Sequence, residues 1–430
     1  MADKTLDGQA ENLMDERYAH RWGFTDSTFK RNGGYTVSFT GSRYALSGTE
    51  MPEFLPFVEE MLDIKLDLNY VKPEVTDKPA ADPVFNDTFW QTLQQAFPAS
   101  QYSYEKLERI VHSHGQTTAD EVYKVIYGRL DRIVDLVVYP ESDEDVEKLV
   151  ALAQKHNVCL VPYGGGTSVS CALQLPGSDP RMMVAVDMRR MNKIVWIDRE
   201  NYRAEVQAGM TGKQLEEELE AQGFTSGHEP DSLELSTVGG WIATNASGMK
   251  KNRYGNIEQI VENVTMITPR GVIEQKESMP RISIGMQPQQ MFFGSEGNLG
   301  IITKAVIKIH KLPEAKKYGS LVFPDFKSGT NFLYDLMRSG TLPASVRLLD
   351  NVQFRFGSAL KPTPTATDAL MNKLQKFFLL KVKGFDPNEL CAATIVMEGT
   401  AEEVAFQNKL INQIAKKHRG IAGGETNGKR

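Results

Sequence analysis

The chain has 430 residues, of which 41% are hydrophobic and 24% charged, a balance typical of globular proteins rather than of disordered ones. Its formal net charge of −6 provides no general basic field that would hold nucleic acid, so no nucleic-acid partner is expected. The length predicts about two or three domains. Three cysteines are too few for a disulfide framework and indicate a reducing compartment, where we expect them to be small buried hydrophobes: Cys159, Cys171 and Cys391.

The first 130 residues predict a mainly helical N-terminal region. The segment PEFLPFVEEML, residues 52–62, repeats apolar residues at helical spacing. These residues share one helical face: Phe54, Phe57, Val58 and Met61. Residues 71–83 carry prolines among charges, so an exposed connector is expected there.

Residues 131–313 predict a domain of two packed α+β lobes. A strand within 133–140 is followed by a helix over 142–157, whose cap is Ser142, and then by a short strand over 158–161. The helix buries the residues that recur at helical spacing: Val146, Leu149, Val150 and Ala153. The chain therefore forms a β-α-β unit here.

More strands and one helix complete this domain. The helix opens with a capping box from Thr211 to Gln214 and ends at Gly223. Runs rich in β-branched residues predict strands at 182–188, 193–198, 202–209 and 300–313, and a hairpin at 261–275.

Residues 314–430 predict a further α+β domain. Strands are expected at 319–324, 343–350 and 391–399, and the longer helices at 327–340 and 401–418. This order of elements favours an antiparallel sheet with helices on one face.

Three consecutive glycines stand in VPYGGGTSVS, residues 161–170. Glycine is the costliest residue to order, so such a run is kept where a positive φ is needed or where another group approaches the backbone. The run follows a strand, where exposed N–H groups can form a nest for an anion, and Thr167 and Ser168 add hydroxyl groups. The alternative is a flexible turn.

Two further segments, 228–256 and 294–303, also combine glycines with Ser, Thr or Asn. Main-chain amides together with hydroxyl groups can hold the pyrophosphate and riboses of a nucleotide. The same residue types also dominate ordinary turns, which remains the competing interpretation.

The sequence contains no complete Rossmann or P-loop motif and no convincing set of metal ligands. No G-x-G-x-x-G opens a helix after a strand, and in GGETNGKR, which imitates a P-loop, Arg430 stands where Ser or Thr is required. His112 and His114 lack nearby carboxylate or cysteine partners, so we predict no metal site and expect core or surface histidines.

A cationic run, GMKKNRYG, leaves two interpretations open. Its side chains could meet a phosphate group or lie in a solvated turn: Lys250, Lys251 and Arg253.

With these segments in view, residues 132–313 resemble the flavin-binding domain of the vanillyl-alcohol oxidase/PCMH-type superfamily. The segment GHEPDSLELSTVGGWIATNASGMKKNRYGNIE, residues 227–258, is similar to the alkylglycerone-phosphate synthase family of ether-lipid assembly. The likeness runs from about Arg43 to the last residue and includes PASVRLLDN and KGFDPNEL. It implies FAD bound between two α+β lobes and an α+β cap domain over the flavin ring.

The resemblance also implies which residues bind the cofactor. Two stretches would wrap the pyrophosphate of FAD: Pro162, Tyr163, Gly164, Gly165, Gly166, Thr167 and Ser168; and Asp231, Ser232, Leu233, Glu234, Leu235, Ser236 and Thr237. Two others would supply further backbone and hydroxyl contacts: Thr244, Asn245, Ala246 and Ser247; and Glu296, Gly297, Asn298, Leu299, Gly300, Ile301 and Ile302. On this interpretation the glycines let the main chain close on the diphosphate, where a Cβ would obstruct it. Thr167 stands where covalent flavoproteins of the superfamily carry histidine, which predicts non-covalent FAD.

The chemistry that the family implies involves no net oxidation. Acyl-dihydroxyacetone phosphate loses a proton, its carbon attaches to flavin N5 and the fatty acid leaves, after which a long-chain fatty alcohol adds; the flavin serves as an electron sink. Arg347 matches an arginine that the family needs for activity and would pair with the substrate phosphate. Its competing role is an ion pair with Asp350.

Other family features are expected to lie outside this sequence. The family's catalytic tyrosine, a second phosphate-binding arginine and a triple-histidine segment follow the cap domain, so residues 1–430 alone would bind FAD weakly and lack turnover. Peroxisomal location, a homodimer and peripheral membrane contact follow from resemblance only, since the final NGKR is not the peroxisomal tripeptide.

Two other functions compete with a synthase. One is an FAD-dependent 2-hydroxy acid dehydrogenase of the same fold, and the other is a non-catalytic module that binds flavin. The match within the cap region favours the synthase.

Overall fold

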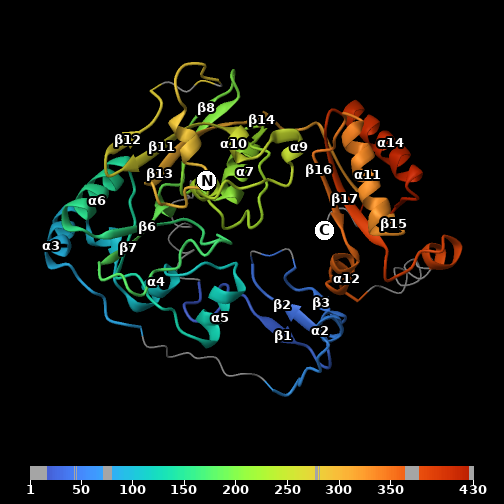
Figure 1. Ribbon diagram of the computed structural model, residues 1–430, viewed down its shortest axis with the longest axis horizontal. Helices are drawn as coiled ribbons and strands as arrows, with labels where there is room; N and C mark the ends of the chain where they lie inside the picture. Colours follow the sequence, from blue (N-terminus) through green and yellow to red (C-terminus); the bar gives the residue numbers. More distant parts are fainter. Residues whose placement is uncertain are drawn as a thin grey trace, which may run out of the picture. The chain divides into compact units, whose positions relative to one another are not determined.

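The computed structural model describes residues 17–42, 44, 46–70, 80–276, 279, 281–363 and 377–425. The chain divides into two compact units (Figure 1). The first unit comprises Met1–Thr25, Pro73–Gly248 and Gly255–Leu312, and the second comprises Asp26–Lys72, Met249–Tyr254 and Pro313–Arg430. Each unit is described by itself below.

The first sheet of unit 1 has the strand order β4-β5-β7-β6. Three strands are parallel, and β4 is an antiparallel edge strand; their bounds are β4 Tyr102–Ser103, β5 Leu136–Val138, β6 Cys159–Tyr163 and β7 Met183–Asp187. The predicted β-α-β unit is confirmed, with α6 (Asp143–His156) joining β5 to β6 and β7 lying between them. Ser142 caps α6 by accepting a hydrogen bond from the N–H of Asp145.

The face of α6 that was predicted to be buried is buried. It packs with α3 (Asp87–Ala96) and the parallel strands in one apolar cluster. The members from α6 are Val146, Leu149, Val150 and Ala153. Burial on this stripe holds the parallel strands, and with them the loop that follows β6, in place.

The second sheet of unit 1 is antiparallel, with the order β12-β11-β13-β9-β8. Its strands are β8 Ile194–Asp198, β9 Arg203–Gln207, β11 Val261–Thr268, β12 Gly271–Ile273 and β13 Ile301–Lys308, in agreement with the strands predicted from sequence. The capping box of α7 (Gly212–Ala221) is also confirmed.

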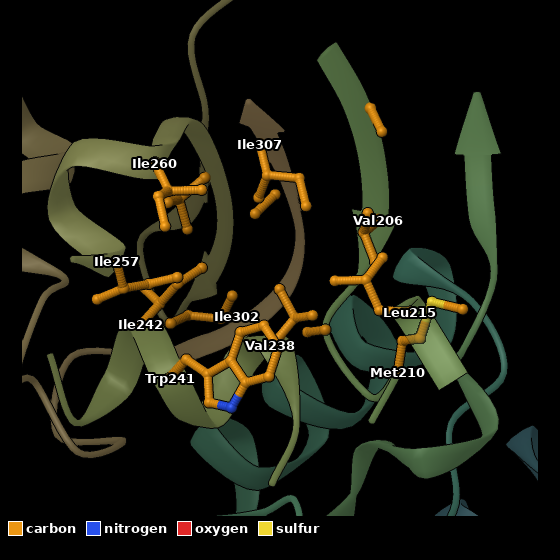
Figure 2. Packing of buried hydrophobic residues seen from close by; sticks show 14 of the residues in the cluster. Val206, Met210, Leu215, Val238, Trp241, Ile242, Ile257, Ile260, Ile302 and Ile307 are labelled. Carbon is orange, nitrogen blue, oxygen red and sulfur yellow. The ribbon is translucent and has the colours of Figure 1, made fainter. Parts of the chain in front are cut away.

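Two short helices, α8 (Val238–Ala243) and α10 (Ile257–Ile260), pack with β9, β11 and β13 over an apolar core. Figure 2 shows part of this cluster: Val206, Met210, Leu215, Val238, Trp241, Ile242, Ile257, Ile260, Ile302 and Ile307. Because Val238, Trp241 and Ile242 are almost fully buried, the N-terminus of α8 and the loop before it are fixed by this core.

The remaining elements among the described residues of unit 1 are short. They are η1 Ala99–Gln101, α4 Lys106–Val111, α5 Ala119–Tyr127, η2 Met188–Arg190, β10 Phe224–Thr225, η3 Pro288–Met291 and β14 His310–Lys311.

Unit 2 contains the predicted antiparallel sheet, in the order β16-β17-β15-β18. Its strands are β15 Ala315–Phe323, β16 Ser345–Leu349, β17 Cys391–Gly399 and β18 Ile421–Ala422. Helices α11 (Phe326–Arg338) and α14 (Ala401–Lys417) cover one face (Figure 1).

The expectation that all helices lie on one face of this sheet is wrong. Along β15, Leu321 and Phe323 pack with α11 and α14, whereas Val322 points to the other face. There it meets Phe354 of α12 (Asn351–Ala359) and the following π-helix, η4 (Phe378–Val382). Successive strand residues point to opposite faces, so this sheet buries both.

The predicted helix at 52–62 forms as α2 (Phe54–Leu62), but its apolar side is only partly covered and Met61 is exposed. A small sheet that was not predicted packs beside it: β1 Phe29–Arg31, β2 Val37–Phe39 and β3 Glu50–Met51. Strands of two or three residues are too short to show an alternating pattern. Unit 2 also contains α9 (Lys251–Tyr254), and most of the predicted connector, 71–79, lies outside the described residues.

Candidate flavin site

The glycine run forms the loop after β6 and packs directly against the loop before α8. A Cβ added at Gly164 would lie 2.4 Å from Thr237 Oγ1, and one added at Gly165 would lie 2.0 Å from the carbonyl oxygen of Leu235. No side chain fits at either distance. These two glycines are therefore required by contact between protein loops, whereas the sequence interpretation had assigned the requirement to the diphosphate.

Gly166 serves a different purpose. Its φ of +70° lies in the left-handed region, which glycine adopts without strain. The N–H groups of Gly166 and Thr167 make no hydrogen bond to any of the residues that the structure describes. Consecutive unpaired amides at a left-handed turn form the kind of nest that binds an anion, so the loop fits the diphosphate of FAD.

The stretch around Gly297 meets the same loop. Gly297, with φ of +81°, lies so close to Pro162 that an added Cβ would be 3.0 Å from the proline Cδ. Glu296 accepts a hydrogen bond from Ser170 Oγ at 2.6 Å, and its own N–H donates to the carbonyl of Ala243. The fold thus brings together loops from four separate stretches of the sequence.

Several of the expected hydroxyl donors are already engaged within the protein. Thr244 Oγ1 donates to the carbonyl of Gly240 at 2.8 Å, and Ser247 Oγ lies 2.9 Å from the acceptor Asn256 Oδ1. Ser236 Oγ accepts from the indole N–H of Trp241, and Thr237 caps α8. Because a hydroxyl has one hydrogen, Thr244 and Ser247 have none left for an anion, whereas Ser236 and Thr237 act as acceptors here and keep theirs.

The other expected cofactor residues occupy three settings. The loop before α8 holds Asp231, Ser232, Leu233 and Glu234, with Ser232 at φ of +58°. The turns next to α8 and β13 hold Asn245, Ala246, Asn298, Leu299 and Gly300. Buried side chains belong to the strands and the core beneath them: Tyr163, Ile301 and Ile302.

A charged network lies buried at the end of β7. Asp187 pairs with Arg189 and also accepts from His112 Nε2 at 2.8 Å. Burial alone would raise the pKa of the Asp187 carboxyl, but Arg189 and His112 outweigh it and hold this pKa well below its usual range. His112 is thus a core histidine held by hydrogen bonds, in agreement with the sequence prediction.

The sequence analysis missed His228, which lies in the segment leading into the loop 231–237. Its side chain is 1% exposed, and neither ring nitrogen has a hydrogen-bond partner among the described residues. Its ring lies 4.9 Å from that of Trp241, and burial lowers its pKa to about 4. A neutral, unpaired imidazole beside the flavin loops is a candidate for contact with a ligand. The preceding Gly227 gave no signal of this burial, which comes from packing near Trp241 and Gly248 in the folded chain.

Arg347 lies on β16 in unit 2, and its guanidinium is exposed. Nη1 lies 2.9 Å from Met249 Sδ, and no carboxylate partner is found for it in the described part of the chain. The competing ion pair with Asp350 does not form, because this carboxylate instead caps α12 by accepting from the N–H of Gln353.

Lys250 fits neither interpretation of the cationic run. It is buried, and its ammonium lies 3.2 Å from Glu398 Oε1 on β17. Lys316 Nζ and the hydroxyl of Tyr254 also contact this carboxylate. Burial alone would raise the pKa of Glu398, yet the two lysines and the tyrosine lower it. Lys250 is therefore a structural cation of unit 2, while Lys251 is exposed.

The expectation for the cysteines is right for one of the three. Cys391 is buried, which raises the pKa of its thiol to about 11, whereas Cys159 and Cys171 are half-buried. Within the described residues, no helix has the length and apolar character needed to cross a membrane.

Comparisons with known proteins agree with this geometry. The FAD binding domain family matches residues 134–275, and the C-terminal domain family of FAD linked oxidases matches residues 312–428. An alkyldihydroxyacetonephosphate synthase from Caenorhabditis elegans is 42% identical over 410 residues, which cover 95% of this chain and 68% of that protein. The enzyme of the same name from Dictyostelium discoideum is 34% identical over 393 residues, which cover 89% of this chain and 64% of that protein.

The fold is also similar to a solved structure of an alkyldihydroxyacetonephosphate synthase in P1. The TM-score is 0.85 at 32% sequence identity, and the match covers 96% of this chain and 75% of the other. The chain spans 68% and 64% of the lengths of the two relatives above. Because the chain matches both FAD family models and shares this identity over nearly its whole length, it belongs to the alkyldihydroxyacetonephosphate synthase family of FAD-linked enzymes.

Proposed function

We propose that this protein replaces the acyl group of acyl-dihydroxyacetone phosphate with a long-chain alkyl group taken from a fatty alcohol. The observation that carries the proposal is the 42% identity to an alkyldihydroxyacetonephosphate synthase, which extends through both units. The products are alkyl-dihydroxyacetone phosphate, an ether lipid precursor, and a free fatty acid.

The exchange breaks the bond between C1 of the substrate and the acyl oxygen and forms a bond between C1 and the alcohol oxygen. The fatty acid leaves with the acyl oxygen, the alcohol gives up its proton, and no electrons are gained or lost overall. FAD, when bound, supplies an electron sink that lets C1 exchange its substituent.

In this proposal the chain's own residues bind and orient. The amides of Gly166 and Thr167 hold the diphosphate of FAD, and Thr167 offers no imidazole for a covalent bond, so the cofactor is non-covalent. Arg347, exposed and without a carboxylate partner in the described residues, receives the substrate phosphate. Peroxisomal location, dimerisation and contact with a membrane surface belong to the same proposal and are supported by family membership alone.

The cofactor is tested by the absorbance spectrum of the purified protein before and after acid precipitation. Yellow flavin released into the supernatant is the expected result. Flavin that stays with the precipitate would contradict non-covalent binding, and protein that takes up no FAD would remove the basis of the whole proposal.

The reaction is tested with radiolabelled fatty alcohol and acyl-dihydroxyacetone phosphate, using the full natural gene product. Label is expected in alkyl-dihydroxyacetone phosphate. Replacing Arg347 by Met should raise KM for the phosphate substrate at least about tenfold, as expected for loss of a charge-assisted contact. Arg338→Met, which removes an exposed arginine of α11 in the same unit, is the matched control.

The dehydrogenase alternative gives a different result. An enzyme that oxidises a 2-hydroxy acid bleaches its flavin when it is mixed with that substrate without oxygen, whereas the synthase does not undergo stoichiometric two-electron reduction. Anaerobic bleaching by lactate or glycolate, with no label incorporated, would therefore favour the dehydrogenase.

A further inference from the structure

Residues 17–24 contact the glycine loop through Arg17. Arg17 forms an antiparallel bridge with Phe24 and is only 8% exposed. Its Nη1 donates to the hydroxyl of Tyr163 at 2.7 Å, and its Nη2 donates to the carbonyl oxygen of Gly165 at 3.1 Å. One guanidinium therefore holds both the last residue of β6 and the middle glycine of the run.

A second contact holds the next carbonyl of the same loop. The main-chain N–H of Gln116 donates to the carbonyl oxygen of Gly166 at 2.7 Å. The carbonyl of Gln116 in turn accepts from Trp22 Nε1 at 2.9 Å, so Gln116 is itself held by the segment that carries Arg17. Two consecutive carbonyl groups of the loop are thus bound from one side.

These contacts decide where the neighbouring N–H groups point. In a planar trans peptide the C=O and the N–H of the following residue point in opposite directions. With the Gly165 carbonyl directed at Arg17, the N–H of Gly166 points away from Arg17. With the Gly166 carbonyl directed at Gln116, the N–H of Thr167 points away from Gln116. Neither of these two amides has a hydrogen-bond partner among the described residues.

We propose that Arg17, aided by the Trp22–Gln116 contact, is a positioning residue that presents the amides of Gly166 and Thr167 to the diphosphate of FAD. The inference rests on the proposed cofactor site and assigns to residues 17–24 a part in cofactor affinity. Arginine suits this task because its planar fork reaches two acceptors at once, whereas lysine can offer only a single point charge. Without the fork, the Gly165 carbonyl loses its hydrogen bond and the glycine-rich loop is less well ordered, so more of the ordering cost falls on anion binding.

The test measures the Kd of FAD by fluorescence titration and the Kd of ADP by competition. ADP carries the diphosphate without the flavin ring. Arg17→Met should weaken FAD and ADP by the same factor, about tenfold or more, since a buried charge-assisted contact no longer orders the loop. Arg17→Lys should recover part of the affinity. Thermal unfolding of the cofactor-free variants shows how much of the effect is general destabilisation.

Arg181→Met is the matched control, because Arg181 is an exposed residue of the same unit whose partner is Asp179. If Arg17→Met does not fold, Trp22→Phe removes one hydrogen bond while keeping an aromatic ring, and it should weaken both ligands about threefold. The inference is overturned if the variants bind FAD and ADP as tightly as the control, or if FAD weakens while ADP does not. Failure of the unaltered protein to bind either nucleotide would instead defeat the cofactor assignment itself.

Discussion

Gly165 resembles a cofactor contact in sequence, but packing between two loops of the protein is what requires a glycine at this position. The carbonyl oxygen of Leu235 occupies the place where its Cβ would be, so the loops at 162–168 and 231–237 can approach only because residue 165 has no side chain. The anion site then lies one residue further along, at the left-handed Gly166.

Gly165→Ala is therefore expected to destabilise the protein by about 1–3 kcal/mol, because the added methyl group forces one of the two loops to move. The same movement should weaken FAD binding. Denaturant unfolding and FAD titration measure the two effects. Gly357→Ala is the control, since a Cβ there meets nothing within 4 Å and its position inside α12 favours alanine. Equal stability of Gly165→Ala and wild type would show that the loops are not in contact.

His228 predicts a pH dependence of stability. Burial depresses its pKa to about 4 in the folded chain, while in the unfolded chain it titrates near the ordinary value of about 6.5. Below that value the unfolded chain binds a proton that the folded chain does not, so stability is complete at pH 7 and falls as the pH is lowered. Lowering the pH from 7 to 5 should reduce the free energy of unfolding by about 2 kcal/mol through this one group.

Urea unfolding of wild type and His228→Gln at pH 7 and pH 5 isolates this contribution. The variant should lose less stability than wild type over this interval, by about the amount given above. Identical losses would mean that the imidazole is solvated in the folded protein.

At the scale of elements, the segment Met249–Tyr254 follows the expected flavin stretch 244–247 in sequence but belongs to unit 2. Lys250 and Tyr254 hold it to Glu398 on β17, and Asn252 donates to the carbonyl of Pro343. A buried carboxylate with several partners fixes this segment to the sheet of unit 2.

Lys250→Met should cost about 3–5 kcal/mol of stability, because it leaves Glu398 buried with less compensation. Replacing both residues, Lys250→Met with Glu398→Met, should cost clearly less than the sum of the two single changes, since no unpaired charge is left. Lys251→Met, at the exposed neighbouring residue, should change stability by no more than about 0.5 kcal/mol. Denaturant unfolding of the four variants gives the coupling energy, and a value near zero would contradict the buried ion pair.

Elements with strong local signals were predictable from sequence. The helix α6 has its serine cap and buried stripe, α7 its capping box and α14 a capping box between Thr400 and Glu403. The small sheet β1–β3 and the face on which α12 packs were not predictable. Strands of two or three residues carry too little pattern, and the two faces of a sheet that is buried on both sides look alike in sequence.

For the whole molecule, the apolar clusters found among the described residues each lie within one unit. The largest clusters of unit 1 are built around its two larger sheets, and those of unit 2 around β15, β17 and the segment 26–72. A unit with its own core can unfold by itself.

Calorimetry is therefore expected to resolve two unfolding transitions. FAD should raise the midpoint of one of them, that of unit 1, because a ligand stabilises only the folded part that binds it. At a free FAD concentration of about 100 times Kd, the free energy of unfolding of unit 1 should rise by about 2.7 kcal/mol. The variants Gly165→Ala in unit 1 and Lys250→Met in unit 2 identify the transitions, because each should lower the midpoint of its own unit. A single transition that moves as a whole with FAD would show that the units unfold together.

The sequence by itself determined the α+β class, most strands and capped helices, and the glycine-bearing stretches, because these depend on residues close together in the chain. Only the tertiary structure decided that a carbonyl of Leu235 lies against Gly165, that Lys250 is buried against Glu398 and that His228 has no hydrogen-bond partner within the described part of the chain. Each of these facts joins residues distant in sequence or depends on which groups exclude water, and burial is set by the packing of the whole unit.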